Sequence, residues 1–168
     1  MKEFKNIFFI GGGSWGQALA ISLARAGYSS SIMVSDQDRK TILNENKSSS
    51  FPEVNFPDLI SAFTTKEKLK KYDLIFITTE SYRVEKTLTQ LIKINPKCKV
   101  IITSKGFANN EGETFPEIIL KKYKELNFGI LTGPTFADEV AKNLPSAAVV
   151  ASINKSFAKK ISSNFFNT

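Results

Sequence analysis

Residues 5–36 read KNIFFIGGGSWGQALAISLARAGYSSSIMVSD, and this stretch decides the fold class. It begins with an apolar run, Lys5–Ile10, passes through three glycines, and enters a helical pattern, Ser14–Ala26, which Gly27 ends as a helix C-terminal glycine does. A strand, a glycine-rich turn and a helix in this order open a βαβ unit. The sequence therefore predicts an α/β protein that begins with a parallel strand.

Three of these glycines, Gly11, Gly13 and Gly16, fit the spacing G-x-G-x-x-G. In that pattern the first glycine allows a tight turn, the second lets the backbone approach a pyrophosphate, and the third permits close packing of helix on strand. The N–H groups of Ser14, Trp15 and Gly16 are expected to face phosphate oxygens at the helix N-terminus. The loop is thus a candidate dinucleotide site, and the alternative is a glycine-rich turn without a ligand.

An acidic residue favours the dinucleotide. Asp36 ends the second predicted strand, 20 positions after Gly16. At about this spacing a carboxylate accepts hydrogen bonds from the ribose hydroxyls of NAD. Because glycine loop, strand, helix and acid occur together, we expect the chain to bind NAD(H), with the Trp15 side chain packed locally in the turn.

The rest of the chain alternates between strand and helix patterns. Strands are expected at Lys5–Ile10, Ser31–Ser35, Ser61–Thr64, Leu74–Thr78, Cys98–Thr103, Phe128–Leu131 and Ala147–Ser152. Helices are expected at Ser14–Ala26, Gln37–Asn46, after a Thr64–Glu67 capping box, over Val84–Ile92, after Thr114–Glu117, after Gly133–Pro134 and at Lys155–Phe166. The alternation predicts a doubly wound, mainly parallel sheet with helices on both faces.

Composition excludes several classes of protein. The 168 residues suit one domain, and none is histidine, which excludes Ser-His-Asp and Cys-His catalysis and His-ligated zinc. A single cysteine, Cys98, excludes an internal disulfide and a multi-cysteine metal site, so we expect no metal and a reducing compartment. No segment approaches the roughly 20 apolar residues of a membrane span. The expected location is the cytoplasm.

The net charge of +7, from 23 basic and 16 acidic residues, raises the alternative of a nucleic-acid surface. The lysines, however, come in groups of three or four within predicted helices, such as Lys121, Lys122 and Lys124. Groups of this kind are typical of solvated helix faces. We therefore expect no nucleic-acid partner.

Two further clusters follow predicted strands, at the sheet edge where doubly wound folds bind ligands. The first is Thr103-Ser104-Lys105-Gly106, whose lysine would reach into the crevice and hold a phosphate or polarise a carbonyl, unless it is a plain surface charge. The second, Gly133-Pro134-Thr135-Phe136-Ala137, offers N–H groups and a hydroxyl to an anion. Its alternative role is a proline-initiated helix that Thr135 caps.

Four segments together resemble the bacterial-type NAD(P)-dependent glycerol-3-phosphate dehydrogenases. They are GGGSWGQALA (11–20), SKGF (104–107), GPTFADEVA (133–141) and PSAAVVAS (145–152), and Phe51–Pro57 resembles the Leu-Pro-Gly segment of that family. The resemblance implies reversible hydride transfer between NAD(P)H and dihydroxyacetone phosphate, which gives sn-glycerol 3-phosphate for phospholipid synthesis. A related dehydrogenase, such as ketopantoate reductase, and a non-catalytic NAD(H)-binding module remain the alternatives.

The resemblance also implies roles for individual residues. Ser14, Trp15 and Ala137 match cofactor contacts, Gly133 and Thr135 match substrate contacts, and Lys105 matches a lysine that touches both cofactor and substrate. Lys105 is therefore the expected catalytic residue of this chain, and it would stabilise negative charge on the substrate.

Two departures from the family concern the cofactor. Asp36 stands where many members carry an arginine suited to the 2′-phosphate of NADP. A carboxylate repels that phosphate, so we predict a preference for NAD(H), with NADP(H) as the alternative cofactor. Thr78-Thr79-Glu80 replaces the Val-Pro-Ser of the family, which leaves the shape of this loop open.

The third departure concerns length. The proton-transferring lysine of the family belongs to a helical C-terminal domain, whereas residues 1–168 match a near-complete dinucleotide-binding domain. We therefore expect the substrate domain to lie outside this chain, Phe165 and Phe166 to pack against a following strand and that domain, and the full-length enzyme to form a homodimer. Lys142, in a segment that merely looks like the family's Ala-x-Lys-Asn, is expected to be a surface residue.

Overall fold

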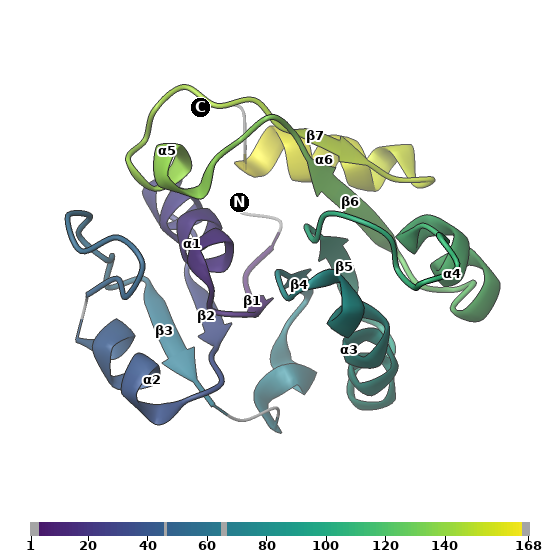
Figure 1. Ribbon diagram of the computed structural model, residues 1–168, viewed down its shortest axis with the longest axis horizontal. Helices are drawn as coiled ribbons and strands as arrows, with labels where there is room; N and C mark the ends of the chain where they lie inside the picture. The colour runs from purple at the N-terminus through teal and green to yellow at the C-terminus, as the bar shows by residue number, and fades with distance from the viewer. Residues whose placement is uncertain (1–3, 46, 65–66, 166–168) are drawn as a thin grey trace.

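A seven-stranded sheet forms the centre of the protein, for which a computed structural model describes residues 4–45, 47–64 and 67–165 (Figure 1). Its order is β3-β2-β1-β4-β5-β6-β7. The strands are β1 (Ile7–Ile10), β2 (Ser30–Met33), β3 (Ile60–Phe63), β4 (Leu74–Ile77), β5 (Lys99–Ile102), β6 (Phe128–Thr132) and β7 (Val149–Ala151). All pairs are parallel except β6–β7, so the predicted doubly wound, mainly parallel sheet is confirmed.

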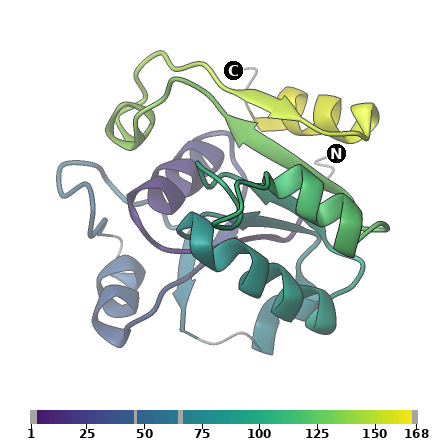
Figure 2. The same ribbon diagram turned by 45° about the vertical axis from the view of Figure 1, so that its right-hand side comes forward.

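Helices cover both faces of the sheet (Figures 1 and 2). They are α1 (Ser14–Arg25), α2 (Gln37–Asn44), the 3-10 helix η1 (Glu67–Lys71), α3 (Ser81–Ile94), α4 (Phe115–Lys122), α5 (Ala137–Ala141) and α6 (Lys155–Phe165). The buried residues of α1 and α6 belong to one apolar cluster, and those of α3 and α4 belong to a second. Each cluster fills one face of the sheet.

Strand β1 shows why its sequence is apolar without alternation. Ile7 and Phe9 belong to the cluster under α1, whereas Phe8 and Ile10 belong to the cluster under α3. Because successive side chains of a strand point to opposite faces, a central parallel strand needs apolar residues at every position. The Phe9 ring also stacks on Phe76 of the adjacent strand, at 4.8 Å between ring centroids.

Two expected helices differ in the structure. In place of the predicted basic helix after β3, the structure has the short 3-10 helix η1, whose Leu69 enters the core and is 2% exposed. The capping box predicted for it cannot be followed in the structure, because the Glu67 side chain lies outside the described part. The helix expected at Gln37–Asn46 ends at Asn44, and Asn46 also lies outside the described residues.

The C-terminal helix also corrects an expectation. Phe165 is part of the core of this structure. Its ring packs against Phe4, Tyr28 and Phe76, and the residue is 2% exposed. Phe157, Ile161 and Phe165 recur one turn apart on α6, so they present one apolar stripe to the sheet. Phe166 lies outside the described residues.

Burial governs the reactivity of Cys98, the residue before β5. Its side chain is 3% exposed, and burial raises the pKa of the thiol to about 11. A raised pKa leaves little of the reactive thiolate at pH 8, because the thiolate becomes the major form only above the pKa. We therefore expect a disulfide reagent to modify the folded protein at least about tenfold more slowly than the protein in guanidinium chloride, as followed by absorbance. Equal rates would show that Cys98 is accessible.

No helix within the described residues is both long enough and apolar enough to cross a membrane.

Candidate functional site

The glycine loop between β1 and α1 is shaped by close backbone contacts. Gly11 has a φ of +119°, and a Cβ atom there would lie 2.8 Å from Oγ1 of Thr78. A Cβ atom on Gly16 would lie only 2.1 Å from the carbonyl oxygen of Gly11. A Cβ atom on Gly13, by contrast, would meet nothing within 4 Å. Gly11 and Gly16 therefore serve the packing of the loop, while Gly13 opens onto free space.

Polar side chains outside the motif fix this loop. The Thr78 hydroxyl, just beyond β4, donates a hydrogen bond to the carbonyl oxygen of Gly11 at 2.6 Å. Gln17 is fully buried. Its side-chain Nε2 donates a hydrogen bond to the carbonyl oxygen of Gly12 at 2.8 Å and another to Oγ of Ser49 at 2.9 Å. Oγ of Ser48 donates in turn to Oε1 of Gln17 at 2.7 Å. The loop is thus tied to β4 and to the serine-rich segment at once.

A cavity of about 320 Å³, the central cavity, lies over the glycine loop. Gly11–Gly13 form part of its lining. Ser35 and Arg39, which follow β2, line it as well, and so do Thr79 and Arg83, which follow β4. The carboxyl ends of β1, β2 and β4 therefore meet at one cavity, at the sheet edge where doubly wound folds bind nucleotides.

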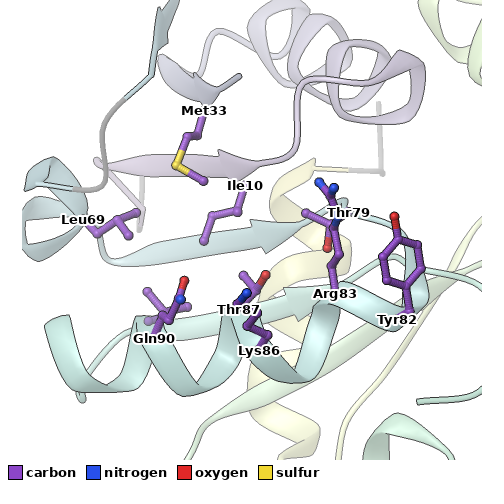
Figure 3. A pocket seen from close by; sticks show the side chains of 10 residues that line it. Ile10, Met33, Leu69, Thr79, Tyr82, Arg83, Lys86, Thr87 and Gln90 are labelled. Carbon is purple, nitrogen blue, oxygen red and sulfur yellow. The ribbon is translucent and has the colours of Figure 1, made fainter. Parts of the chain in front are cut away.

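A second cavity, the α3 cavity, has a volume of about 530 Å³ and adjoins the central one. Figure 3 shows apolar side chains, Ile10, Met33 and Leu69, along one side, with Thr87 and Gln90 of α3 facing them. Both cavities share the lining residues Ile10, Met33, Thr79 and Arg83. An apolar slot with a few polar groups suits a flat heterocycle such as adenine.

A third cavity, the Lys105 cavity, has a volume of about 410 Å³ on the other side of the glycine loop. It brings together Ser14, Trp15, Lys105, Thr135 and Ala137, five of the residues that sequence reasoning selected. With the central cavity it shares Gly13, Thr78, Thr79 and Glu80. The three cavities therefore adjoin one another along the carboxyl ends of the strands, and together they are called the groove.

The residues of this groove fit a dinucleotide. Oγ1 of Thr79 is buried and has no hydrogen-bond partner among the described atoms, although Thr79 lines all three cavities. The N–H groups of Ser14, Trp15 and Gly16 belong to the first turn of α1, where a helix offers no acceptor for them. Donors of this kind and the open space at Gly13 suit a diphosphate and its ribose hydroxyls.

The helix α5 is positioned by the end of α1. The Arg25 guanidinium donates hydrogen bonds to the carbonyl oxygens of Val140, at 3.1 Å, and Ala141. These bonds hold α5 beside α1, so that Ala137 at the start of α5 lies over the glycine loop. Arg25 also satisfies carbonyls that the end of a short helix leaves without partners.

Asp36 lies between β2 and α2, close to the end of the second strand. Its Oδ1 accepts the backbone N–H of Arg39 at 2.7 Å, so it caps α2, and it does not line any of the three cavities described above. This backbone hydrogen bond lowers the pKa of Asp36, with smaller contributions from Ser35 and the Arg39 charge, so the group stays ionised at neutral pH. The residues that line the groove here are Ser35 and Arg39, which sequence reasoning missed.

Gly133 and Lys142 are also placed by the structure. A Cβ atom on Gly133 would lie 2.5 Å from the carbonyl oxygen of Ala147, and Gly133 does not line the Lys105 cavity. The close approach of the backbone around Ala147 therefore explains why residue 133 is a glycine. Nζ of Lys142 pairs with Asp138 at 2.9 Å and with Glu53 at 3.4 Å, away from the groove. Within the described ranges, no group of three or more His, Cys, Asp or Glu side chains gathers as a metal site does.

Comparison with known proteins identifies the family of this chain. The family model of the NAD-dependent glycerol-3-phosphate dehydrogenase N-terminus matches residues 6–158. The glycerol-3-phosphate dehydrogenase [NAD(P)+] of Rickettsia bellii (strain OSU 85-389) is 32% identical over 98% of this chain, which covers 53% of that relative. That of Francisella tularensis subsp. novicida (strain U112) is 31% identical over 97% of this chain, covering 51% of the relative.

A solved structure has the same fold over nearly the whole of this chain. The crystal structure of glycerol-3-phosphate dehydrogenase from Coxiella burnetii superposes with a TM-score of 0.88 at 26% identity, over 98% of this chain and 51% of that one. The chain thus spans about half the length of the relatives it matches. Because the family model matches residues 6–158, the chain belongs to the NAD-dependent glycerol-3-phosphate dehydrogenase N-terminal family.

Proposed function

We propose that this chain is the cofactor-binding half of an NAD(P)-dependent glycerol-3-phosphate dehydrogenase, which interconverts dihydroxyacetone phosphate and sn-glycerol 3-phosphate. The observation that carries the proposal is the row of adjoining cavities from the α3 cavity, over the glycine loop, to Lys105. A dinucleotide has one base on each side of a diphosphate. The groove has one end cavity on each side of a loop whose N–H groups are free.

In this proposal each part of the groove would bind one part of the cofactor. The α3 cavity would hold the adenine, and the N–H groups of Ser14, Trp15 and Gly16 would hold the diphosphate. The Lys105 cavity would place the nicotinamide ring beside the substrate. When bound, the nicotinamide supplies or accepts the hydride. Thr79 would donate its buried hydroxyl to the cofactor at the junction of the three cavities.

Lys105 would bind and orient the substrate. Its side chain is exposed in the groove, and no described residue forms an ion pair or a hydrogen bond with its ammonium group. An ammonium without a protein partner is available to a phosphate or to the oxygen of a carbonyl that gains negative charge. The buried residue Thr135, in the same cavity, would add its hydroxyl as a donor. A lysine beyond the family's N-terminal half would move the proton on the substrate oxygen.

The proposal extends to the setting of the enzyme. The product would feed glycerophospholipid synthesis, and the full-length protein would act in the cytoplasm as a homodimer. The buried, unpaired Cys98 is compatible with a reducing compartment. Because the chain spans about half the length of its relatives, we expect it to bind cofactor yet reduce little dihydroxyacetone phosphate by itself.

Cofactor binding can be measured on this chain directly. Trp15 is the single tryptophan and lines the Lys105 cavity, so NADH is expected to quench its fluorescence with a saturable curve. Calorimetry gives an independent dissociation constant and stoichiometry. The proposed nucleotide site is contradicted if neither method detects NADH at millimolar concentration.

The activity is to be measured on the protein that the whole natural gene encodes. We expect it to oxidise NADH with dihydroxyacetone phosphate and to leave ketopantoate unchanged. Activity with ketopantoate alone would make it a related reductase. NADH binding without activity toward either substrate would support a non-catalytic nucleotide-binding module.

A further inference from the structure

A fully buried glutamine, Gln17, has no role in the function proposed above, although it contacts the glycine loop. It is the fourth residue of α1. Its Nε2 donates a hydrogen bond to the carbonyl oxygen of Gly12 at 2.8 Å, and it also lies 2.9 Å from Oγ of Ser49 and 3.1 Å from Oγ of Ser50. An amide has two N–H donors, so the two serines share the one that Gly12 leaves.

Ser48 determines which end of this amide faces Gly12. Its Oγ accepts hydrogen bonds from the backbone N–H groups of Ser50, at 3.2 Å, and Phe51, at 2.9 Å. The hydroxyl proton of Ser48 therefore goes to Oε1 of Gln17, which accepts it at 2.7 Å. Because Oε1 is engaged by this donor, Nε2 is the end of the amide that faces the Gly12 carbonyl.

The bond to Gly12 fixes the direction of the next N–H group. The described part of the chain contains no cis peptide bond, and in a trans peptide the C=O of one residue and the N–H of the next point in opposite directions. Since the Gly12 carbonyl points to Gln17, the Gly13 N–H points away from Gln17. Gly13 lines both the central cavity and the Lys105 cavity, beside which the diphosphate is proposed to lie.

The peptide between Gly12 and Gly13 has no side chains that would hold its orientation. Glycine adopts positive and negative φ about equally readily, so this peptide can turn over at low steric cost. After such a flip the Gly12 carbonyl oxygen would face the diphosphate and repel it. We propose that Gln17 is a positioning residue, which holds this peptide in the orientation that binds the diphosphate. The inference rests on the proposed dinucleotide function of the groove.

The test uses Gln17→Glu, which keeps the shape of the side chain and replaces the NH₂ donor by an oxygen. At pH 8 the carboxylate would repel the Gly12 carbonyl, so the dissociation constant of NAD+ is expected to rise about tenfold, the effect of roughly one hydrogen bond. Burial raises the pKa of a carboxyl group, so at pH 5.5 the protonated side chain donates again. The constant should then return to within about threefold of that of the unaltered chain.

The unaltered chain is the control for pH. It contains no histidine, so its affinity for NAD+ should change by less than about twofold between pH 5.5 and pH 8. Calorimetry measures the constant at each pH. A side chain that served only the stability of the fold would alter the free energy of unfolding in urea without this pH-dependent change in affinity.

Two further variants separate positioning from stability. Ser48→Ala leaves Gln17 in place but removes the donor that orients its amide, so NAD+ is expected to bind about threefold more weakly. Asn44→Asp is the matched control, because Nδ2 of Asn44 also donates to a backbone carbonyl, that of Ala62 at 3.2 Å, and Asn44 lines none of the three cavities. It should lower the free energy of unfolding and leave the constant for NAD+ within about twofold.

The outcomes distinguish the role of Gln17 from the function on which it rests. If the unaltered chain binds no NAD+, the proposed dinucleotide function fails. If the unaltered chain binds NAD+ and folded Gln17→Glu binds it equally well at pH 8, only the positioning role is overturned. The same conclusion follows if Asn44→Asp weakens NAD+ as much as Gln17→Glu does. If Gln17→Glu does not fold at pH 8, the loss expected in Ser48→Ala decides, and unchanged affinity there overturns the role.

Discussion

Gly16→Ala is expected to destabilise the fold by about 2–3 kcal/mol, at the upper end of the cost of overpacking a core. The added methyl group would lie 2.1 Å from the carbonyl oxygen of Gly11 and 2.8 Å from Oγ1 of Thr78. Neither atom moves easily, because the Thr78 hydroxyl donates to that same carbonyl oxygen. Helix α1 would have to shift away from β1, and urea unfolding followed by circular dichroism measures the cost.

Gly13→Ala is the matched variant, and it is expected to lose binding rather than stability. A Cβ atom at Gly13 meets no atom within 4 Å, and its φ of −71° is accessible to alanine. The unfolding free energy should therefore fall by at most about 1 kcal/mol, the cost of a poorer helix cap. The methyl group would instead occupy the space of the diphosphate, so the dissociation constant of NADH should rise at least about tenfold, equivalent to 1.4 kcal/mol.

Reversal of this pattern would contradict the assignment of the two glycines. A stable Gly16→Ala protein would show that α1 does not depend on the close contact with Gly11. A Gly13→Ala protein that binds NADH as well as the unaltered chain would show that the diphosphate does not approach this part of the loop.

Most of the fold could be predicted because its signals are local. Continuous apolar runs such as Leu74–Ile77 predict strands buried on both faces, and the structure places them at the centre of the sheet. The Thr114–Glu117 capping box at the start of α4 is confirmed, with Oε2 of Glu117 accepting the Thr114 N–H at 2.7 Å. Turn, cap and periodicity are properties of neighbouring residues, so one sequence suffices to read them.

The burial of Phe165 could not be predicted in the same way. Its partners Phe4, Tyr28 and Phe76 come from three distant parts of the chain, and only the strand order brings them to one face. The sequence pattern of an apolar residue near the end of a chain does not distinguish burial in the core of this domain from burial against another domain. Tertiary packing decides between the two.

The site likewise combines residues that local sequence patterns identify with residues that only the tertiary structure identifies. The glycine motif and the Ser104–Lys105 segment carry recognisable patterns, and the structure brings them to one groove. Thr79 departs from the family's pattern in its loop, and Arg39 and Arg83 carry no motif. Their relevance depends on β4 lying next to β1 and on α2 and α3 starting at the same sheet edge. The spacing points to Asp36 but does not reveal that its carboxylate caps α2.

Lys105→Gln is expected to reduce kcat/KM for dihydroxyacetone phosphate by about 10²–10³ in the protein made from the whole natural gene, the usual loss for one oxyanion-stabilising group. The substitution keeps much of the side-chain length and removes the charge that would face the substrate in the Lys105 cavity. Lys105 lies on an exposed turn beyond β5, so the unfolding free energy should change by no more than about 0.5 kcal/mol. Steady-state NADH oxidation and urea unfolding measure the two effects separately.

Lys142→Gln is the control that makes this result specific. Lys142 is the other lysine with a family-like setting, but its ammonium pairs with Asp138 and Glu53 on the surface. Exposed pairs contribute about 1 kcal/mol or less, so activity should stay within about twofold. If Lys142→Gln lost as much activity as Lys105→Gln, catalysis would depend on the α5 surface. If Lys105→Gln kept full activity, the charge in the groove would serve neither substrate nor transition state, and the Lys105 cavity would lose its catalytic assignment.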